Sequence, residues 1–329
     1  MVLIDYDARG FAASWGPRLS GRGSLGVPFL AVIAAALTVG RPSKSAVLRY
    51  GVYSRAELVS RLFQVVANLD PSNGCLARSP AYLGLDPSEK SAISYYCGMT
   101  LAKLIAEELF AVPFLQHIGS YPPPSVQYQT TLRPDLAGLD ASGRWYVVEA
   151  KGRSNDANSD VLLKAKRQTM AVRCVNGASP RLRLAVVTDF PRGVLRVQLE
   201  DPEDAEGVPV DWDVSVEQTL LLHYALYLAV ITSYDNVEIA MGNRRFTAVQ
   251  LAEVDLTIGV EVRLFRLLKA LGLPTASDTL VKEILELLPR QVEHVRAADV
   301  LPRGLSSVRI GGDGMLIGVG RSWNLDDDA

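Results

Sequence analysis

The pattern of apolar and polar positions predicts three helices in the first 110 residues. Residues 29–39 are almost entirely apolar and are followed by Gly40-Arg41-Pro42, which indicates a buried helix. Ser54-Arg55-Ala56-Glu57 is a capping box that should start a helix running to about residue 69. Asp86-Pro87-Ser88-Glu89 places an N-cap acid before a first-turn proline and predicts a longer helix ending near Phe110.

The second half of that longer helix carries an acid on its apolar face. The stripe repeats at helical spacing and consists of Leu101, Leu104, Ile105, Leu109 and Val112. By helical phase, Glu108 falls within this stripe and Glu107 lies to its side. We therefore expect Glu108 rather than Glu107 to face inward and to need a partner. The alternative is that the edge of the stripe is solvated and both acids lie on the surface.

Strand signals dominate the next segment. Residues 114–121 form a candidate first strand. Residues 136–139 and 145–148 are short apolar runs joined by Asp140-Ala141-Ser142-Gly143, which is turn chemistry, so they predict a β-hairpin with a buried second strand. A helix over 160–176 and strands over 182–190 and 194–199 should follow.

The remaining chain predicts a mixed third region. After an acidic boundary at 201–213 we expect an apolar helix over 214–234, strands over 237–241 and 246–258, and helices over 260–272 and 278–298. A final hairpin over 306–320 should turn at Gly311-Gly312-Asp313-Gly314. The predicted class is α/β, of the α+β type with a mixed sheet. It comprises a mostly helical region 1–86, a core 87–205 and an α+β region 206–329 for recognition or oligomerisation.

Composition narrows the class of protein without naming a function. The chain has 329 residues and a net charge of −2, which by itself does not indicate a nucleic-acid binder. Residues 144–183 hold nine basic residues against three acidic ones, a local net charge of +6 that suits a phosphate backbone. An ordinary basic helix face would give the same count.

Several other sites and locations are disfavoured by the sequence. Cys75, Cys97 and Cys174 are isolated, which argues against a zinc site or a disulfide framework and fits a cytoplasmic protein. The apolar segment 27–39 is too short to span a bilayer, so no membrane association is expected. The glycine-rich stretch 21–26 lacks the flanks of a phosphate loop and is expected to be a flexible loop. The three histidines are scattered and are interpreted as structural.

The predicted hairpin gathers charges at one end. Glu149 and Lys151 are two apart at the end of the second strand, so they share a face of the sheet. Asp135 follows Pro134 at the start of the first strand and should lie across from Glu149. Two carboxylates this close repel each other unless a cation lies between them, and Mg²⁺ (or Mn²⁺) accepts such oxygen ligands. The alternative is a solvated hairpin with a surface Glu-x-Lys pair.

Pro134-Asp135 followed by Glu149-Ala150-Lys151 resembles the signature of the PD-(D/E)xK nuclease superfamily, over roughly residues 88–200. That superfamily includes restriction endonucleases, Holliday-junction resolvases and RecB-like or Mrr-like nucleases. The resemblance implies a restriction-endonuclease-like core, with Asp135 and Glu149 as metal ligands and Lys151 as the catalytic lysine. Many members add a glutamate from the preceding helix, a role that Glu108 matches by phase.

The resemblance also suggests residues that contact the substrate. RecB-like nucleases carry a glutamine on the helix after the lysine strand, and Gln168 has a compatible position. The aromatic residue that often follows one turn later is Val172 here, so the subgroup is not assigned and Gln168 can equally be a surface glutamine. Arg153, Lys164 and Arg167 are the cations expected to bind nucleic acid together with Gln168.

The leading expectation is therefore a Mg²⁺-dependent phosphodiesterase, an endonuclease rather than an exonuclease, acting on nucleic acid and preferably DNA. By fold-level analogy such an enzyme could serve restriction, repair or anti-phage defence, as a homodimer or with a partner protein of a defence system. A second hypothesis is a nuclease-fold binding or assembly subunit that is inactive or active only in a complex. A third is a ligand sensor that uses the C-terminal region.

Overall fold

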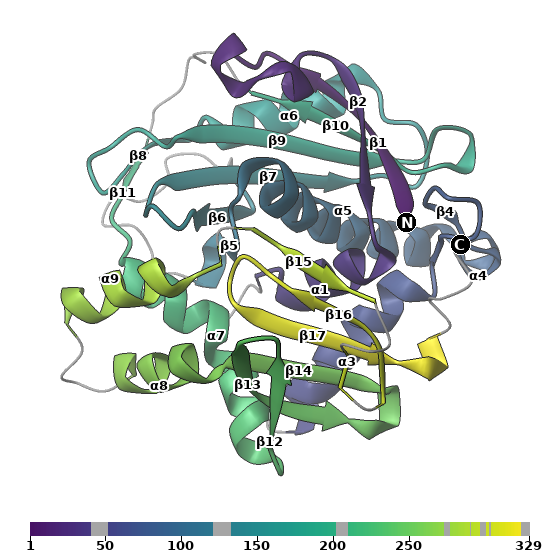
Figure 1. Cartoon of the computed structure of the whole chain (residues 1–329). Coiled ribbons are helices and arrows are strands. Elements are labelled where there is room, and N and C mark those ends of the chain that lie inside the picture. The colour runs from purple at the N-terminus through teal and green to yellow at the C-terminus, as the bar shows by residue number, and fades with distance from the viewer. Residues whose placement is uncertain are drawn as a thin grey trace.

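The computed structural model describes residues 1–40, 52–120, 133–201, 210–272, 277–289, 291–296, 301–302 and 304–323, with backbone only at 52–55 and 57. The described chain is a mixed α/β structure with eight α-helices and two large sheets (Figure 1). None of the described helices combines the length and the apolar composition needed to cross a bilayer.

A seven-stranded mixed sheet forms the first half of the molecule. Its strand order is β2-β1-β10-β9-β7-β6-β5. The strands are β1 (Val2–Arg9), β2 (Arg22–Val27), β5 (Phe114–His117), β6 (Leu136–Leu139), β7 (Trp145–Gly152), β9 (Leu182–Asp189) and β10 (Arg196–Glu200). β7 and β9 run parallel at its centre, whereas β6 and β5 continue the sheet in antiparallel pairs. The predicted hairpin and the two strands after it are confirmed.

Two helices cover opposite faces of this sheet. α5 (Pro87–Phe110) packs on β7 and begins at the predicted capping box of Asp86 and Glu89. α6 (Ser159–Thr169) packs on β9 and β7 from the other side, and is shorter than predicted because β8 (Val172–Val175) follows it and pairs with β11 (Val210–Trp212). Neighbouring residues of β7 therefore face different helices.

The N-terminal region, predicted to be mostly helical, also contributes two strands to the main sheet. β1 joins the main sheet by pairing in parallel with β10, and the glycine-rich stretch expected to be a loop is the edge strand β2. The predicted buried helix does form, as α1 (Phe29–Thr38), and every residue in it is buried. The remaining elements of this region are α3 (Val52–Val66), α4 (Pro80–Gly84), the short pair β3 (Leu69–Asp70) and β4 (Ala77–Arg78), and the 3₁₀ turns Ala13–Trp15 and Pro17–Leu19.

The C-terminal region is a second, six-stranded antiparallel sheet in the order β12-β13-β14-β17-β16-β15. Its strands are β12 (Val237–Met241), β13 (Arg244–Leu251), β14 (Leu256–Glu261), β15 (Glu293–Val295), β16 (Leu305–Ile310) and β17 (Met315–Gly320). The helices are α7 (Val216–Ser233), α8 (Val262–Leu271) and α9 (Asp278–Leu287). The final hairpin is confirmed. The predicted strand 246–258 is instead divided between β13 and β14, and the predicted helix 278–298 ends at Leu287.

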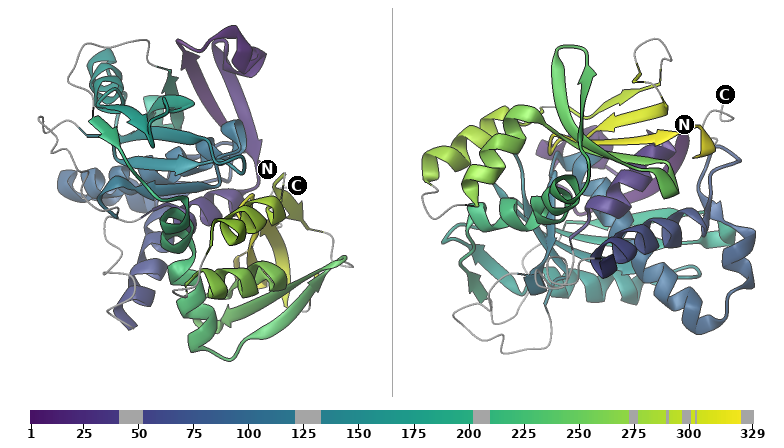
Figure 2. Two further views of the ribbon diagram at one scale, coloured as in Figure 1. Left: turned by 90° about the vertical axis from the view of Figure 1, so that its left-hand side faces the viewer. Right: turned by 90° about the horizontal axis from the view of Figure 1, so that it is seen from below.

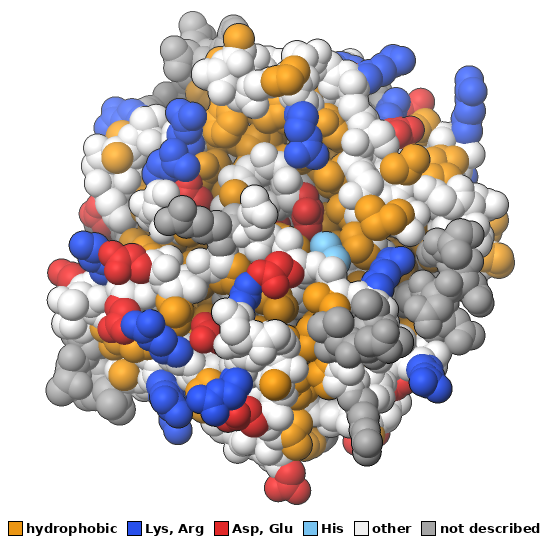
Figure 3. Space-filling model, in the orientation of Figure 1, with side chains coloured by type: hydrophobic (Ala, Val, Ile, Leu, Met, Phe, Trp, Pro, Cys, Tyr) orange, Lys and Arg blue, Asp and Glu red, His pale blue; other side chains and the backbone are white. Residues whose placement is uncertain are grey.

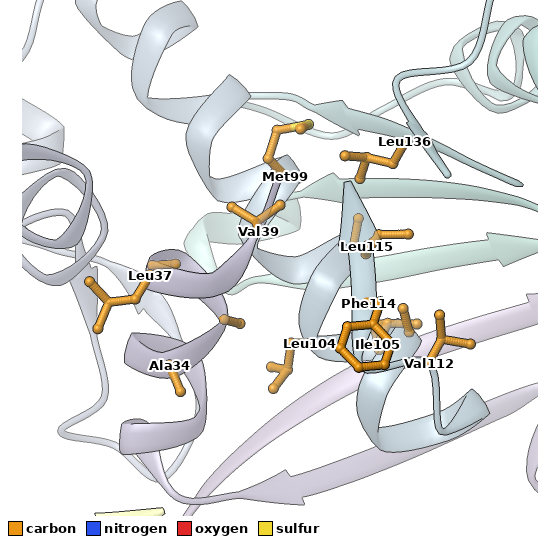
Figure 4. Packing of buried hydrophobic residues seen from close by; sticks show 14 of the residues in the cluster. Ala34, Leu37, Val39, Met99, Leu104, Ile105, Val112, Phe114, Leu115 and Leu136 are labelled. Carbon is orange, nitrogen blue, oxygen red and sulfur yellow. The ribbon is translucent and has the colours of Figure 1, made fainter. Parts of the chain in front are cut away.

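One hydrophobic core connects the two sheets. α1 packs on α5 from one side and on β16 and β17 from the other, which explains why its whole circumference is apolar (Figures 1 and 2). Figure 4 shows Leu115 and Leu136 of the main sheet beside Met99 of α5, with Val39, the residue after α1, also next to Met99. The C-terminal region therefore packs as part of the same body.

Candidate active site

The β6–β7 hairpin fixes the register of the two predicted carboxylates. Asp140 caps its turn by accepting hydrogen bonds from the backbone of Ser142 at 2.9 Å and of Arg144 at 3.0 Å. Gly143 supplies the positive φ of 74° that the turn needs. Leu136 then pairs with Val148, so Asp135, one residue earlier, lies opposite Glu149, one residue later.

Asp135, Glu149 and Lys151 converge as predicted. The Lys151 Nζ is in ion-pair contact with Glu149 Oε1 and lies 4.0 Å from Asp135 Oδ2. The backbone also ties the carboxylates together, since the Asp135 N–H donates to Glu149 Oε2 at 2.8 Å and the Ala150 N–H donates to Asp135 Oδ2 at 3.3 Å. Asp135 Oδ1 takes part in none of these contacts, and Glu149 Oε1 contacts only the Lys151 ammonium.

This cluster lies on the α6 face of the sheet. Glu149 and Lys151 pair with Ala185 and Val187 of β9, which pack under α6. Glu149 is fully buried, whereas the side chains of Asp135 and Lys151 are 24% and 21% exposed. The site is thus open to solvent along Asp135 and Lys151 and closed behind Glu149.

Burial and repulsion make Glu149 an unusual acid. Desolvation, followed by the neighbouring charge of Asp135, raises the pKa of Glu149 to about 8, although Lys151 opposes the shift. A nearby divalent cation would favour the ionised form in the same way as Lys151 does. Glu149 Oε1 is buried and accepts no hydrogen bond of regular geometry. The lysine ammonium therefore supplies the positive charge that this oxygen needs.

The donor set fits Mg²⁺ or Mn²⁺ as a two-carboxylate site. Mg²⁺ is commonly held by one or two carboxylates and keeps several waters for substrate phosphates. Asp135 Oδ1 is available for it, and Glu149 Oε1 would become available once the ion displaced the Lys151 ammonium. Within the part of the chain that the structure describes, no group of three or more Asp, Glu, His or Cys side chains could hold a metal ion. If the third ligand is not a side chain, it would come from water, substrate or the backbone.

The prediction that Glu108 joins this site is wrong, and so is the phase assignment behind it. Glu107 is the buried acid, bound by Lys103 at 3.1 Å and by Arg309 of β16 at 3.1 Å. Glu108 is only partly buried and also pairs with Arg309 at 3.1 Å. Burial acts to raise the pKa of Glu107, but Lys103 and Arg309 outweigh it and lower that pKa to about 2.

The position of Glu108 along α5 explains the failure. α5 meets β7 at Gly98, where an added Cβ would lie 2.7 Å from the Gly152 backbone nitrogen. Glu108 is ten residues further on, roughly 15 Å along the helix axis at 1.5 Å per residue. Gly152 also faces α5, on the side of the sheet opposite to Glu149 and Lys151. Glu107 and Glu108 instead bind the C-terminal sheet to the core.

The predicted nucleic-acid contacts divide into two groups. Arg153, Lys164 and Arg167 are exposed, and in the described residues none of them forms an ion pair with an acid. Gln168 is used differently, because its Nε2 donates to the Arg133 carbonyl oxygen at 3.0 Å and so holds the segment that leads into Asp135. Its side-chain amide is therefore engaged within the protein and is not a free surface group.

The local charge of +6 overstates the positive field. Lys166 pairs with Glu200 at 3.1 Å, Arg173 pairs with Asp211 at 2.6 Å, and Arg144 pairs with the turn acid Asp140 at 2.7 Å. All three acids lie outside the counted window of residues 144–183. On the face shown in Figure 3, basic and acidic side chains alternate and form no continuous basic patch. Phosphate binding would therefore depend on a few unpaired cations.

Asp189 supports the site and was missed by the sequence analysis. It ends β9 beside the end of β7 and is fully buried. Its carboxylate accepts from Arg196 at 2.6 and 3.1 Å, from Gln198 at 3.0 Å and from the Ala157 backbone at 2.9 Å. These bonds fix the loop that follows Lys151. An acid at the end of an apolar strand was the available signal, the same one that identified Glu149.

Two histidines take structural positions, as expected. His223 is buried in α7, within hydrogen-bond distance of Gln116 at 3.1 Å and of Asp313 at 2.7 Å, and so joins the two sheets. His117 accepts from the Gly119 N–H at 2.9 Å at the end of β5.

Comparison with known proteins gave no match, either to a protein-family model, to a curated protein or to a solved structure. A proposal about the function therefore has to rest on the chemistry of Asp135, Glu149 and Lys151.

Proposed function

We propose that this protein is a metal-dependent nuclease that hydrolyses nucleic-acid phosphodiester bonds. The observation that carries the proposal is the convergence of Asp135, Glu149 and Lys151 at one end of a buried strand, with the lysine between two carboxylates. A buried acid whose pKa is raised and which has a specific charged partner is typical of a functional site. Placing Glu149 there costs free energy that a solvated hairpin would not require.

The fold supports the same proposal. α5, β5, the β6–β7 hairpin, α6 and β9 occur along the chain in the order that a restriction-endonuclease-like core would have, with β8 inserted before β9. The sheet carries one helix on each face, and the charged cluster lies where β7 ends. The chain departs from the simplest form of that core by adding β1 and β2 at one edge and a complete second sheet.

The proposed chemistry assigns a role to each side chain. Asp135 and Glu149 would hold Mg²⁺ or Mn²⁺, which when bound supplies Lewis acidity toward the phosphate and lowers the pKa of water. Lys151 carries no lone pair when protonated and does not ligate the ion. Its ammonium would stabilise the negative charge that develops on the phosphate. Gln168 would keep Asp135 in place through the Arg133 carbonyl oxygen.

A binding or assembly subunit is the second candidate. One observation favours it: Lys151 already satisfies Glu149, so the cluster is stable as an ion pair without any metal. In that case Asp135, Glu149 and Lys151 would stabilise the hairpin and the protein would bind nucleic acid or a partner without cutting.

A cleavage assay distinguishes the two candidates. Wild-type protein is incubated with single- and double-stranded DNA and RNA, with Mg²⁺, with Mn²⁺ and with a chelator. The nuclease proposal expects metal-dependent cleavage that Asp135→Ala abolishes. Asp213→Ala removes an exposed acid that follows β11 and serves as the matched control. Cleavage that persists in Asp135→Ala, or in the chelator, would exclude the proposed site.

A further inference from the structure

An exposed tyrosine lies beside the candidate active site and has no role in the chemistry proposed above. Tyr95 is 42% exposed, near the N-terminal end of α5. α5 touches the catalytic strand at this point: a Cβ built on Gly152 would lie 1.6 Å from the Ser94 carbonyl oxygen and 3.1 Å from the Tyr95 backbone nitrogen. Gly152 directly follows Lys151. The backbone of Tyr95 therefore lies next to the end of the strand that carries the site, on the α5 face of the sheet, whereas Glu149 and Lys151 lie on the α6 face.

The electrostatics agree with this placement. Burial of part of the ring raises the pKa of Tyr95, and the charges of Asp135 and Glu149 raise it further. The tyrosine hydroxyl and the two carboxylates are thus close enough to influence one another.

Tyr95 belongs to a small aromatic and cationic group. Its ring lies 5.5 Å from that of Tyr96 in an edge-to-face arrangement, and the Arg61 guanidinium lies 5.8 Å from the centre of the Tyr96 ring. The cavity beneath them has a volume of about 10 Å³, about enough for one water molecule and far too small for a base. A ligand that uses this group must stack on the exposed side of Tyr95.

We infer that Tyr95 is a stacking platform for an unpaired base next to the scissile phosphate, so that the substrate is a single-stranded or locally unpaired nucleic acid. This inference rests on the proposed nuclease function. Bases in a duplex are covered by their neighbours, whereas an unpaired base offers its face to an aromatic ring. The few unpaired cations near the site also suit a short strand better than a duplex interface, which normally covers a large, strongly basic surface.

Binding and cleavage by four proteins test the inference: wild type, Tyr95→Ala, Tyr95→Phe and Phe63→Ala. Phe63 is a matched exposed aromatic, 43% exposed, and its ring stacks on Trp323. Affinity for a short single strand and for the blunt duplex of the same sequence is measured by fluorescence anisotropy without divalent ions. Cleavage of both is then measured with Mg²⁺. Thermal unfolding confirms that each variant is folded.

Loss of one stacked base should weaken single-strand binding by about 5- to 150-fold in Tyr95→Ala. Tyr95→Phe keeps the ring and should stay within about twofold of wild type, as should Phe63→Ala, because neither change removes a stacking surface at the site. Duplex affinity should change little in any variant. Unchanged single-strand affinity in Tyr95→Ala, or an equal loss for the duplex, would overturn the inference. Failure of wild type to cleave any substrate would refute the nuclease proposal instead.

Discussion

The buried carboxyl of Glu149 should make the stability of the protein fall as the pH rises through neutrality. Its pKa is about 8 in the folded protein, against an ordinary value of 4.5. Between these values the folded protein holds a proton that the unfolded chain has released. The free energy of unfolding therefore decreases with rising pH in this window, because the unfolded state binds fewer protons. Protonation of Glu149 in the folded state adds to the free energy of unfolding at low pH. This contribution is lost as the pH rises through about 8 and the folded protein also releases the proton.

The size of the effect follows from the two pKa values. Each unit of pKa difference corresponds to about 1.4 kcal/mol. At pH 6 nearly all folded molecules hold the proton, and at pH 8 about half of them do, so the wild type should lose about 2 kcal/mol of unfolding free energy over this range. Glu149 is fully buried, so solvent screening does not reduce this figure.

Chemical denaturation of wild type and Glu149→Gln at several pH values between 6 and 8 isolates this contribution. Glutamine keeps the shape and cannot ionise, so its stability should exceed that of the wild type by a margin that grows by about 2 kcal/mol as the pH rises. The other ionisable groups are the same in both proteins, so their contributions cancel in the comparison. Saturating Mg²⁺ should narrow the margin at pH 8 by favouring the ionised wild-type carboxylate. If the free energies of unfolding of the two proteins changed in parallel with pH in the absence of metal, the raised pKa of Glu149 would be refuted.

The other predictions concern packing and the acids of α5. Glu108→Gln should leave metal-dependent cleavage within about twofold of wild type in a kinetic assay, because Glu108 pairs with Arg309 away from the site; a loss comparable to that of Asp135→Ala would contradict this. Arg309→Met should lower the free energy of unfolding by about 3–5 kcal/mol, since it leaves the buried Glu107 with one cation fewer. Denaturant titration measures this change, and a loss below about 1 kcal/mol would be inconsistent with a buried ion pair. Gly152→Ala should cost about 1–3 kcal/mol or more and reduce cleavage, because its methyl group would overlap the Ser94 carbonyl oxygen; wild-type stability in this variant would show that α5 does not pack so closely on β7.

The sequence was sufficient where local signals agreed with the final packing. The β6–β7 hairpin has turn residues at its centre and apolar runs on both sides, and its register follows from them. Because side chains alternate along a strand, that register was enough to bring Asp135, Glu149 and Lys151 together. The capping box of Asp86 likewise located the start of α5.

The helical-phase argument did not predict which acid of α5 is buried, because the helix has no solvent-facing side over much of its length. Every residue from Cys97 to Glu107 is buried, since the main sheet lies on one side and α1 and the C-terminal sheet approach from others. An apolar stripe then no longer identifies the inward face. The partner that makes burial of Glu107 possible, Arg309, is about two hundred residues away in the sequence.

Long-range pairing explains the errors at the N-terminus. The parallel pairing of β1 with β10 joins segments from opposite ends of the core, which no local pattern encodes. The glycines of β2 looked like loop residues, but Gly23 is needed for close packing: an added Cβ would lie 2.4 Å from the ring of Tyr6. In the C-terminal region, apolar periodicity did not reveal that the chain leaves the helix at Leu287, shortly before Pro289.

The most direct test of the account separates catalysis from metal binding at the central cluster. Mn²⁺ is titrated calorimetrically into wild type, Asp135→Ala and Lys151→Ala, and the same preparations are assayed for cleavage. Asp135→Ala should lose both metal affinity and cleavage, because a ligand oxygen is removed. Lys151→Ala should lose cleavage yet bind Mn²⁺ at least as tightly as wild type, because the ammonium lies beside the oxygens that would hold the ion. Unchanged cleavage in Lys151→Ala would contradict the catalytic assignment and favour the binding-subunit function.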